Sequence, residues 1–140
     1  MKVYDTANLR NIAVVGHGGA GKTSLVSALL YASRSVDKLG SVPEWTATTD
    51  FDPEESERKV SMAVAIAFAE HRDTKINLID APGFGSFIGE AYAAVRAADA
   101  VAIVVHSSDG IGVQTEKMFE EAEKQGLPVV FVVSQLDIDR

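Results

Sequence analysis

Short continuous apolar runs recur along the chain, separated by stretches with helical spacing. These runs predict five strands, at residues 11–15, 63–69, 75–79, 101–105 and 129–133. The polar residues 71–74 between the second and third runs indicate a hairpin connection. The run at 101–105 contains no polar residue, as is typical of a strand covered on both faces.

Apolar residues at helical spacing predict helices at residues 23–32, 87–98 and 114–124. In the first helix, one face carries the apolar residues Leu25, Ala28, Leu29 and Ala32. In the second, the apolar positions are Phe87, Ala91, Ala94, Val95 and Ala98. The third helix should end at Gly126, as a left-handed cap, with Pro128 just beyond it.

The repeated strand–helix–strand order predicts an α/β fold with three layers, in which helices cover both faces of a mostly parallel sheet. Residues 34–59 break this order because they show no clear periodicity and are rich in acidic residues. A loop of that length inside a compact domain is usually functional or disordered.

A glycine-rich loop follows the first strand and opens the first helix. It matches G-x-x-x-x-G-K-[ST] with the residues Gly16, His17, Gly18, Gly19, Ala20, Gly21, Lys22 and Thr23, and Ser24 follows it. Such a motif can arise by chance as a turn. The strand before it and the helix after it favour the functional interpretation.

The chemistry of this phosphate loop (residues 16–23) follows from its backbone. Consecutive N–H groups and the helix N-terminus form a cradle for anionic oxygens. Lys22 is expected to reach the β- and γ-phosphates, and the Thr23 hydroxyl to bind Mg²⁺. The motif therefore predicts a P-loop NTPase fold and a nucleoside triphosphate ligand. His17 is interpreted as a spacer whose backbone matters.

A second motif, Asp80-Ala81-Pro82-Gly83, directly follows the strand at 75–79. D-x-P-G is also a common turn. After an apolar strand and downstream of a phosphate loop, Asp80 is expected to hold Mg²⁺ through water. Gly83 is expected to offer its N–H to the γ-phosphate at a distance that a side chain would prevent. We therefore predict Lys22, Asp80 and Gly83 as catalytic residues.

The composition of the chain argues against broad nucleic-acid binding and membrane association. The chain has 140 residues, no cysteine and a net charge of −7. This acidity argues against broad nucleic-acid binding, and no sequence-specific DNA binding is expected. No apolar run reaches transmembrane length and the N-terminus lacks a signal-peptide stretch, so a cytoplasmic protein without membrane association is expected.

The phosphate loop, the Asp80–Gly83 motif, and Asp109-Gly110 leading into Gln114 together resemble the GTPase domain of bacterial elongation factor G. The sequence is most similar to the divergent elongation-factor-G-like branch, whose second motif is also D-A-P-G. The resemblance covers essentially the whole chain. It implies GTP or GDP and Mg²⁺ as ligands and the ribosome as a partner, through a full-length factor.

The resemblance also implies that residues 57–62 belong to the first switch segment. Ser61 stands at the position of the family's threonine, whose hydroxyl contacts Mg²⁺; a serine keeps that hydroxyl. The alternative is an ordinary exposed serine at the start of a strand. If the resemblance holds for this segment, residues 34–62 should order with triphosphate and loosen with diphosphate.

Phe84 replaces the histidine that usually follows D-x-P-G in this family and positions the attacking water. A phenyl ring neither donates nor accepts a hydrogen bond, so weak intrinsic hydrolysis is expected. A role in packing against a neighbouring loop is compatible with this.

The family's base-binding pattern N-K-x-D falls at Ser134-Gln135-Leu136-Asp137. Asp137 keeps the carboxylate that accepts from guanine N1–H and its exocyclic amine, although an aspartate after a strand is also a common turn former. Ser134 and Gln135 replace the asparagine and the lysine, so guanine preference is expected to be weakened.

The chain ends just after this motif, where the family has a further strand and helices. We therefore expect an incomplete GTPase domain, with self-association through the exposed sheet edge. Two alternatives to a GTPase stay open. One is a catalytically inert nucleotide-binding module acting as a switch or remnant, favoured by Phe84, Ser134 and Gln135. The other is an ATP-using enzyme, disfavoured by Asp137.

Overall fold

The computed structural model describes residues 2–44, 46–49 and 61–137. Its strands are β1 (Leu9–Gly16), β2 (Ala65–His71), β3 (Thr74–Asp80), β4 (Ala100–His106) and β5 (Val129–Ser134). Its α-helices are α1 (Lys22–Ala32), α3 (Ile88–Arg96) and α4 (Val113–Lys124), with short 3₁₀ turns at Thr6–Asn8 and Gly85–Phe87. All the predicted strands and helices are present, with ends shifted by at most two residues.

The strands form one sheet in the order β2-β3-β1-β4-β5. Strand β1 pairs in parallel with β3 and β4, and β4 pairs in parallel with β5; β2 and β3 are antiparallel. The register places Val14 beside Asp80, Gly16 beside Val104, and His106 beside Ser134. The carboxyl ends of four strands therefore meet at one edge of the sheet, which is where ligands bind in open α/β folds.

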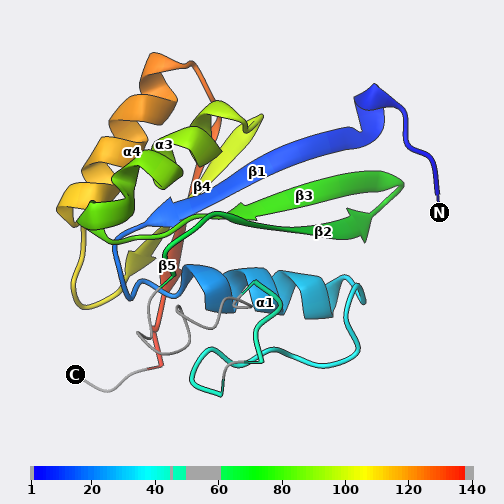
Figure 1. Cartoon of the computed structure of the whole chain (residues 1–140), viewed down its shortest axis with the longest axis horizontal. Coiled ribbons are helices and arrows are strands. Elements are labelled where there is room, and N and C mark those ends of the chain that lie inside the picture. The colour runs from blue at the N-terminus through cyan, green and yellow to red at the C-terminus, as the bar shows by residue number, and fades with distance from the viewer. Residues whose placement is uncertain (1, 45, 50–60, 138–140) are drawn as a thin grey trace.

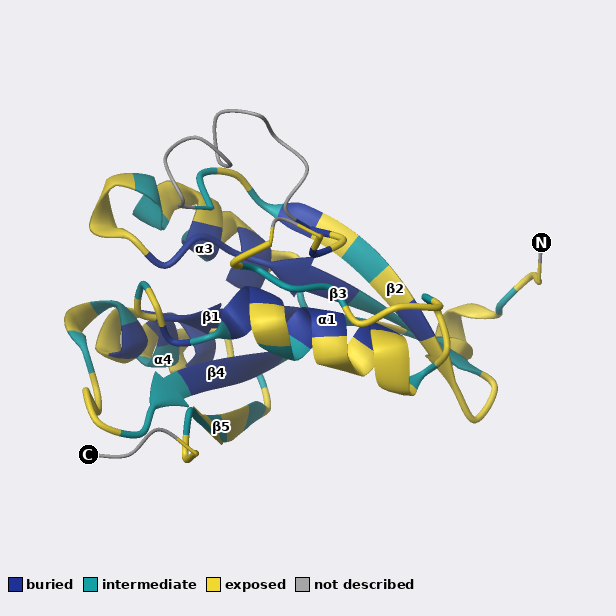
Figure 2. Cartoon of the chain, turned by 90° about the horizontal axis from the view of Figure 1, so that it is seen from below, coloured by how far each residue is buried: buried dark blue, intermediate teal, exposed yellow. Residues whose placement is uncertain are grey.

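Helices cover both faces of the sheet, as predicted: α3 and α4 lie on one face and α1 on the other (Figure 1). Neighbouring residues of β1 alternate between two apolar clusters. Ala13 and Val15 pack with Val95 and Met118 under α3 and α4, whereas Val14 packs with residues such as Leu30 under α1. Burial is concentrated in β1, β4 and the sheet-facing sides of the helices (Figure 2).

Helix α1 buries a different face from the one that the sequence suggested. Val26 and Leu30 are buried with Lys22, Thr23 and Ser27, whereas Leu29 is 41% exposed and Ala28 and Ala32 are also exposed. The reason is geometric. Lys22 begins the helix facing the phosphate loop, and positions four and eight residues later, Val26 and Leu30, share its face.

Local turn chemistry agrees with the sequence. Arg72 and Asp73 both have positive φ, 45° and 61°, as a two-residue turn between twisted antiparallel strands requires. Gly126 has φ +66°, and the Leu127 N–H donates to the Ala122 carbonyl, which caps α4 as expected.

The predicted aperiodic loop is only partly described. Residues 33–44 and 46–49 form turns and irregular backbone. Residues 50–60 lie outside the described residues, and they include most of the loop's acidic positions and most of the predicted switch segment. Among the residues with described structure, no helix combines the length and the apolar character needed to cross a bilayer.

Candidate nucleotide-binding site

The phosphate loop joins the end of β1 to the start of α1, as predicted. Gly21 is the residue before the helix and has a left-handed backbone with φ 86°. A side chain at this position would strain the backbone, which explains why the motif requires glycine here. The Leu25 N–H already donates to the Gly21 carbonyl, so the helix starts directly at Lys22.

Lys22 is buried beside the loop, with 7% of its surface exposed. Its Nζ donates to the His17 carbonyl oxygen at 2.9 Å, so the backbone of His17 holds the lysine in place. Burial lowers the pKa of Lys22 to about 8, and the nearby Asp80 carboxylate acts in the opposite direction. The site therefore holds a desolvated ammonium that an anion would stabilise.

Gly83 lies against the phosphate loop so closely that no other residue fits there. A Cβ at this position would lie 2.2 Å from Lys22 Nζ, 2.7 Å from the Gly18 nitrogen and 2.8 Å from the Gly16 oxygen. Two of these atoms belong to the backbone and cannot rotate away. The structure thus brings the Asp80–Gly83 motif and the phosphate loop together, as the sequence suggested.

The Phe84 side chain covers the phosphate loop at Gly18. A Cβ on Gly18 would lie 2.9 Å from the Phe84 Cζ atom, so the ring rests on a position kept free by glycine. Nearly half of the Phe84 surface, 46%, remains exposed. The loop-packing role considered for Phe84 is therefore present.

Asp80 is 3% exposed at the end of β3. The Thr49 hydroxyl, on a residue that is itself 4% exposed, donates to its Oδ2 at 2.8 Å. Thr49 was not singled out in the sequence, because a threonine in an aperiodic loop carries no pattern that points to a site.

A cavity of about 280 Å³ lies beside the phosphate loop. Its walls include Lys22, Thr23, Ser24, Ser61, Gly83 and Gln135. The fold has therefore brought Ser61 to the same cavity as the phosphate loop. A larger hollow of about 560 Å³ beside Leu30, Arg34 and Phe68 contains none of the predicted site residues.

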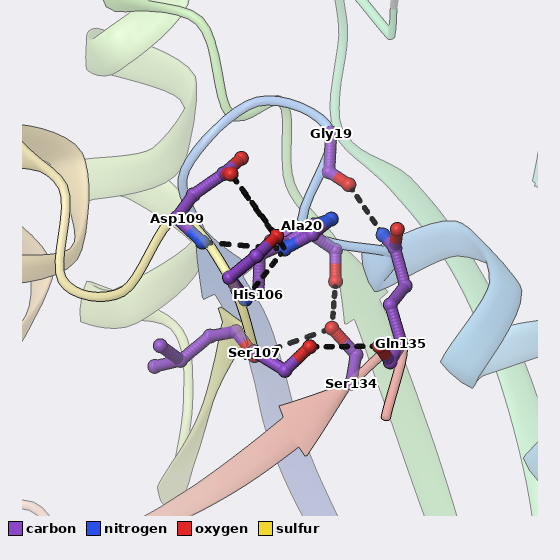
Figure 3. A network of polar contacts seen from close by, with 9 residues as sticks. Gly19, Ala20, His106, Ser107, Asp109, Ser134 and Gln135 are labelled. Carbon is purple, nitrogen blue, oxygen red and sulfur yellow. Dashed lines mark hydrogen bonds and ion pairs between the residues drawn. The ribbon is translucent and has the colours of Figure 1, made fainter. Parts of the chain in front are cut away.

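Ser134 and Gln135, at the end of β5, both bond to the phosphate loop (Figure 3). The Ser134 hydroxyl donates to the Ala20 carbonyl at 2.6 Å, and Gln135 Nε2 donates to the Gly19 carbonyl at 2.9 Å. Gln135 has φ 55°, and its own carbonyl accepts from the Ser107 hydroxyl at 2.7 Å. Both replacements of the expected asparagine and lysine therefore tie β5 to the phosphate loop.

Asp137 follows this corner and is exposed. His106, at the end of β4, has a structural role: its Nδ1 accepts from the Ser108 N–H at 3.1 Å within the turn that leads to Gly110.

Comparison with known proteins identifies the family. The model of the elongation factor Tu GTP binding domain matches residues 7–139. The chain belongs to this family. It is thus a GTPase domain of the translation-factor type, with the P-loop NTPase fold.

The similar proteins include translation factors and a resistance protein. The elongation factor G-like protein of Mycobacterium tuberculosis is 37% identical over 129 residues, which are 92% of this chain and 18% of that protein. The tetracycline resistance protein TetM of Enterococcus faecalis is 35% identical over 127 residues, covering 91% of this chain and 20% of TetM. The chain therefore spans about a fifth of the length of these relatives.

Two solved structures superimpose on nearly the whole chain. A protein of Thermus thermophilus superimposes with a TM-score of 0.89 at 41% identity, covering 94% of this chain and 20% of that chain. A bacterial selenocysteine-specific elongation factor gives a TM-score of 0.74 at 28% identity, covering 94% of this chain and 21% of that chain.

Few side chains of this translation-factor GTPase domain take part in the candidate site. The described site consists mostly of backbone groups with one lysine, one carboxylate and hydroxyls. The sequence found all of these except Thr49. It did not show that Phe84 rests on Gly18 or that Ser134 and Gln135 bond to the phosphate loop, because these contacts join segments far apart in the chain.

Proposed function

We propose that this chain binds GTP and GDP together with Mg²⁺ and hydrolyses GTP slowly in isolation. It would do so as the nucleotide domain of an elongation-factor-G-like protein that acts on the ribosome. The observation that carries the proposal is the shared cavity: Lys22, Thr23, Ser61 and Gly83 come from three separate segments and line one space.

Phosphate binding would use the buried lysine and the loop backbone. The Lys22 ammonium is desolvated, so it gains more from a phosphate anion than an exposed lysine would. Gly83, which packs against Lys22 and the Gly18 nitrogen, would donate its N–H to the γ-phosphate when a triphosphate is bound.

The residues fit Mg²⁺. The donors are the Thr23 and Ser61 hydroxyls and the Asp80 carboxylate, all oxygens, as this hard cation prefers. Thr23 and Ser61 would bind the ion directly and Asp80 through water. Bound there, Mg²⁺ neutralises charge that develops on the phosphate oxygens.

Base selection would rest on Asp137. Its carboxylate can accept from both N–H donors on the guanine edge, and adenine lacks that donor pair. The Ser134 hydroxyl donates to Ala20 of the phosphate loop and to Val105 of β4, and Gln135 donates to Gly19 of the phosphate loop. We therefore infer that guanine is preferred over adenine by less than in relatives with N-K-x-D.

Slow hydrolysis follows from Phe84. Its ring lies over the phosphate loop at Gly18, close to Gly83, without a group that can orient water. The same observation favours a second candidate function, a nucleotide-binding switch module that does not hydrolyse GTP.

A titration with fluorescent GTP, GDP and ATP analogues, with and without Mg²⁺, tests the binding proposal. Guanine-selective, Mg²⁺-dependent binding supports it; no binding, or equal affinity for ATP, contradicts it. Single-turnover hydrolysis then separates the two candidates, because a switch module would retain GTP unchanged.

We also propose that the full-length factor acts in the cytoplasm and that the isolated chain self-associates through β5. This strand lies at the sheet edge and leaves Val130, Phe131 and Val133 more than half exposed. Light scattering should show a mass that rises with concentration. Phe131→Lys should reduce this rise, and a clean monomer for the unmodified chain would contradict the proposal.

A further inference from the structure

Thr49 makes a buried contact that none of the sequence motifs accounts for. Its hydroxyl donates to Asp80 Oδ2 at 2.8 Å across 31 residues of sequence. Both residues are almost fully buried, at 4% and 3% exposure. A hydrogen bond to an ionised carboxylate is about twice as strong as one between neutral groups, and water does not compete for it here.

The segment that carries Thr49 is folded on itself. The Ser41 N–H donates to Thr46 Oγ1 at 2.9 Å, and the Thr46 N–H donates to the Ser41 carbonyl at 3.0 Å. Ala47 is buried against Gly40, where a Cβ would lie 2.7 Å from the Ala47 Cα. Thr49 thus projects from a defined turn rather than from a free loop end.

The same segment borders the proposed phosphate cavity. Val42 and Pro43 line it together with Thr23 and Ser61. Thr49 therefore connects one wall of the cavity to the carboxylate that stands beside Lys22.

The pairing of β3 with β1 fixes the backbone of Asp80. The Thr49 donor on Oδ2 restrains rotation of the carboxylate about its side-chain bonds. Partners of this kind orient groups around metal ions, and their removal typically lowers metal affinity by about tenfold to a hundredfold.

We propose that Thr49 is a positioning residue for magnesium: its hydroxyl holds the Asp80 carboxylate in the orientation that accepts from a magnesium-bound water. The inference rests on the proposed function, since it concerns the same site. It links metal binding to the segment that carries Thr49 through one hydrogen bond.

A purely structural role for Thr49 makes a different prediction. If Thr49 only anchored its segment, losing the hydroxyl would weaken nucleotide binding equally with and without Mg²⁺. A positioning role weakens binding only when Mg²⁺ is present.

The test compares Thr49→Val, which removes the donor at nearly constant shape, with Thr49→Ser, which keeps it. Affinity for a fluorescent, non-hydrolysable GTP analogue is measured from excess EDTA to saturating Mg²⁺, because residues 34–62 are expected to order with the triphosphate. In EDTA, both variants should match the unmodified chain. The Mg²⁺ concentration for half-maximal effect should rise about tenfold for Thr49→Val and stay within about twofold for Thr49→Ser.

Thr46→Val serves as the matched control, because it removes a hydroxyl from the same segment without touching Asp80. It should leave the Mg²⁺ midpoint unchanged. In an Asp80→Asn background, Thr49→Val should have no further effect on the midpoint, which tests the pair even if the single variant is destabilised.

The inference is overturned by an unchanged midpoint in Thr49→Val, by equal losses with EDTA and Mg²⁺, or by the same shift in Thr46→Val. Failure of the proposed function looks different: the unmodified chain itself would then show no Mg²⁺-dependent guanine nucleotide binding.

Discussion

The two ends of the proposed nucleotide site, the phosphate end around Gly18, Lys22 and Gly83 and the base end at residues 134–137, are built in different ways. At the phosphate end, Gly83 and Gly18 are so tightly packed that a single added carbon would collide with neighbouring atoms, and Lys22 is buried. At the base end, Asp137 and Leu136 are exposed, and Ser134 and Gln135 are only half-buried.

This difference indicates which substitutions each end of the site tolerates. At the base end, serine and glutamine stand where the resemblance predicts asparagine and lysine, and their side chains bond to the carbonyls of Ala20 and Gly19. Several side chains can donate to a carbonyl, whereas only glycine leaves room for a backbone contact. We therefore expect substitutions at the phosphate end to have larger effects.

Gly83→Ala should have the largest effect. The added methyl would meet Lys22 Nζ and the backbone of Gly18 and Gly16, so the motif must move away from the loop. We expect single-turnover GTP hydrolysis to fall by about a hundredfold or more. Gly89→Ala is the control, because nothing lies within 4 Å of a Cβ there. Similar rates for both variants would refute the tight contact.

Phe84→His should change the rate in the opposite direction. Imidazole can accept a hydrogen bond from water, whereas the phenyl ring cannot, so hydrolysis should accelerate by about tenfold to a hundredfold. Phe84→Leu, apolar but without the ring, should stay slow. If the histidine variant is no faster in single-turnover assays, Phe84 does not limit the rate.

The phosphate end should also respond to pH through Lys22. Its pKa is about 8 in the free protein, and a bound phosphate anion should raise it. Binding then takes up protons near pH 8. The lysine's contribution to binding is complete below the pKa of the free protein, about 8. It is lost as the pH rises through the higher pKa of the bound form.

Calorimetry in two buffers of different ionisation enthalpy measures this uptake. We expect roughly half a proton per GDP bound at pH 8, with affinity falling about tenfold between pH 7 and pH 9. Lys22→Met should bind more weakly and lose the uptake. Binding without proton exchange at pH 8 in the unmodified chain would argue against the lowered pKa.

Gln135→Ala, at the base end, should have the smallest effect. It removes one hydrogen bond to Gly19, about 1 kcal/mol or roughly fivefold in GDP affinity. Gln135→Lys should restore most of the loss, since an ammonium can donate to the same carbonyl. As a control, Gln125→Ala, in the turn after α4, should leave GDP affinity unchanged. A loss as large as that of Gly83→Ala would remove the contrast between the two ends.

Much of the fold could be predicted because its signals are local. Apolar runs marked the strands, and Gly126 and the Arg72-Asp73 turn adopted the positive φ angles that their positions predicted. The core face of α3 was also predicted, since Ala91, Ala94 and Val95 are buried. The prediction for α1 was less successful because that helix has apolar residues around most of its circumference. Only its attachment to the phosphate loop selects Val26 and Leu30.

The sequence by itself determined the order of strands and helices, the phosphate loop and the position of Asp80 at a strand end. These depend on residue spacing and on backbone angles that single residues allow. The tertiary structure alone decided that Thr49 bonds Asp80, that Phe84 rests on Gly18, and that Ser134 and Gln135 reach the phosphate loop. Those contacts depend on sheet register and loop path, which bring together residues that no local pattern relates.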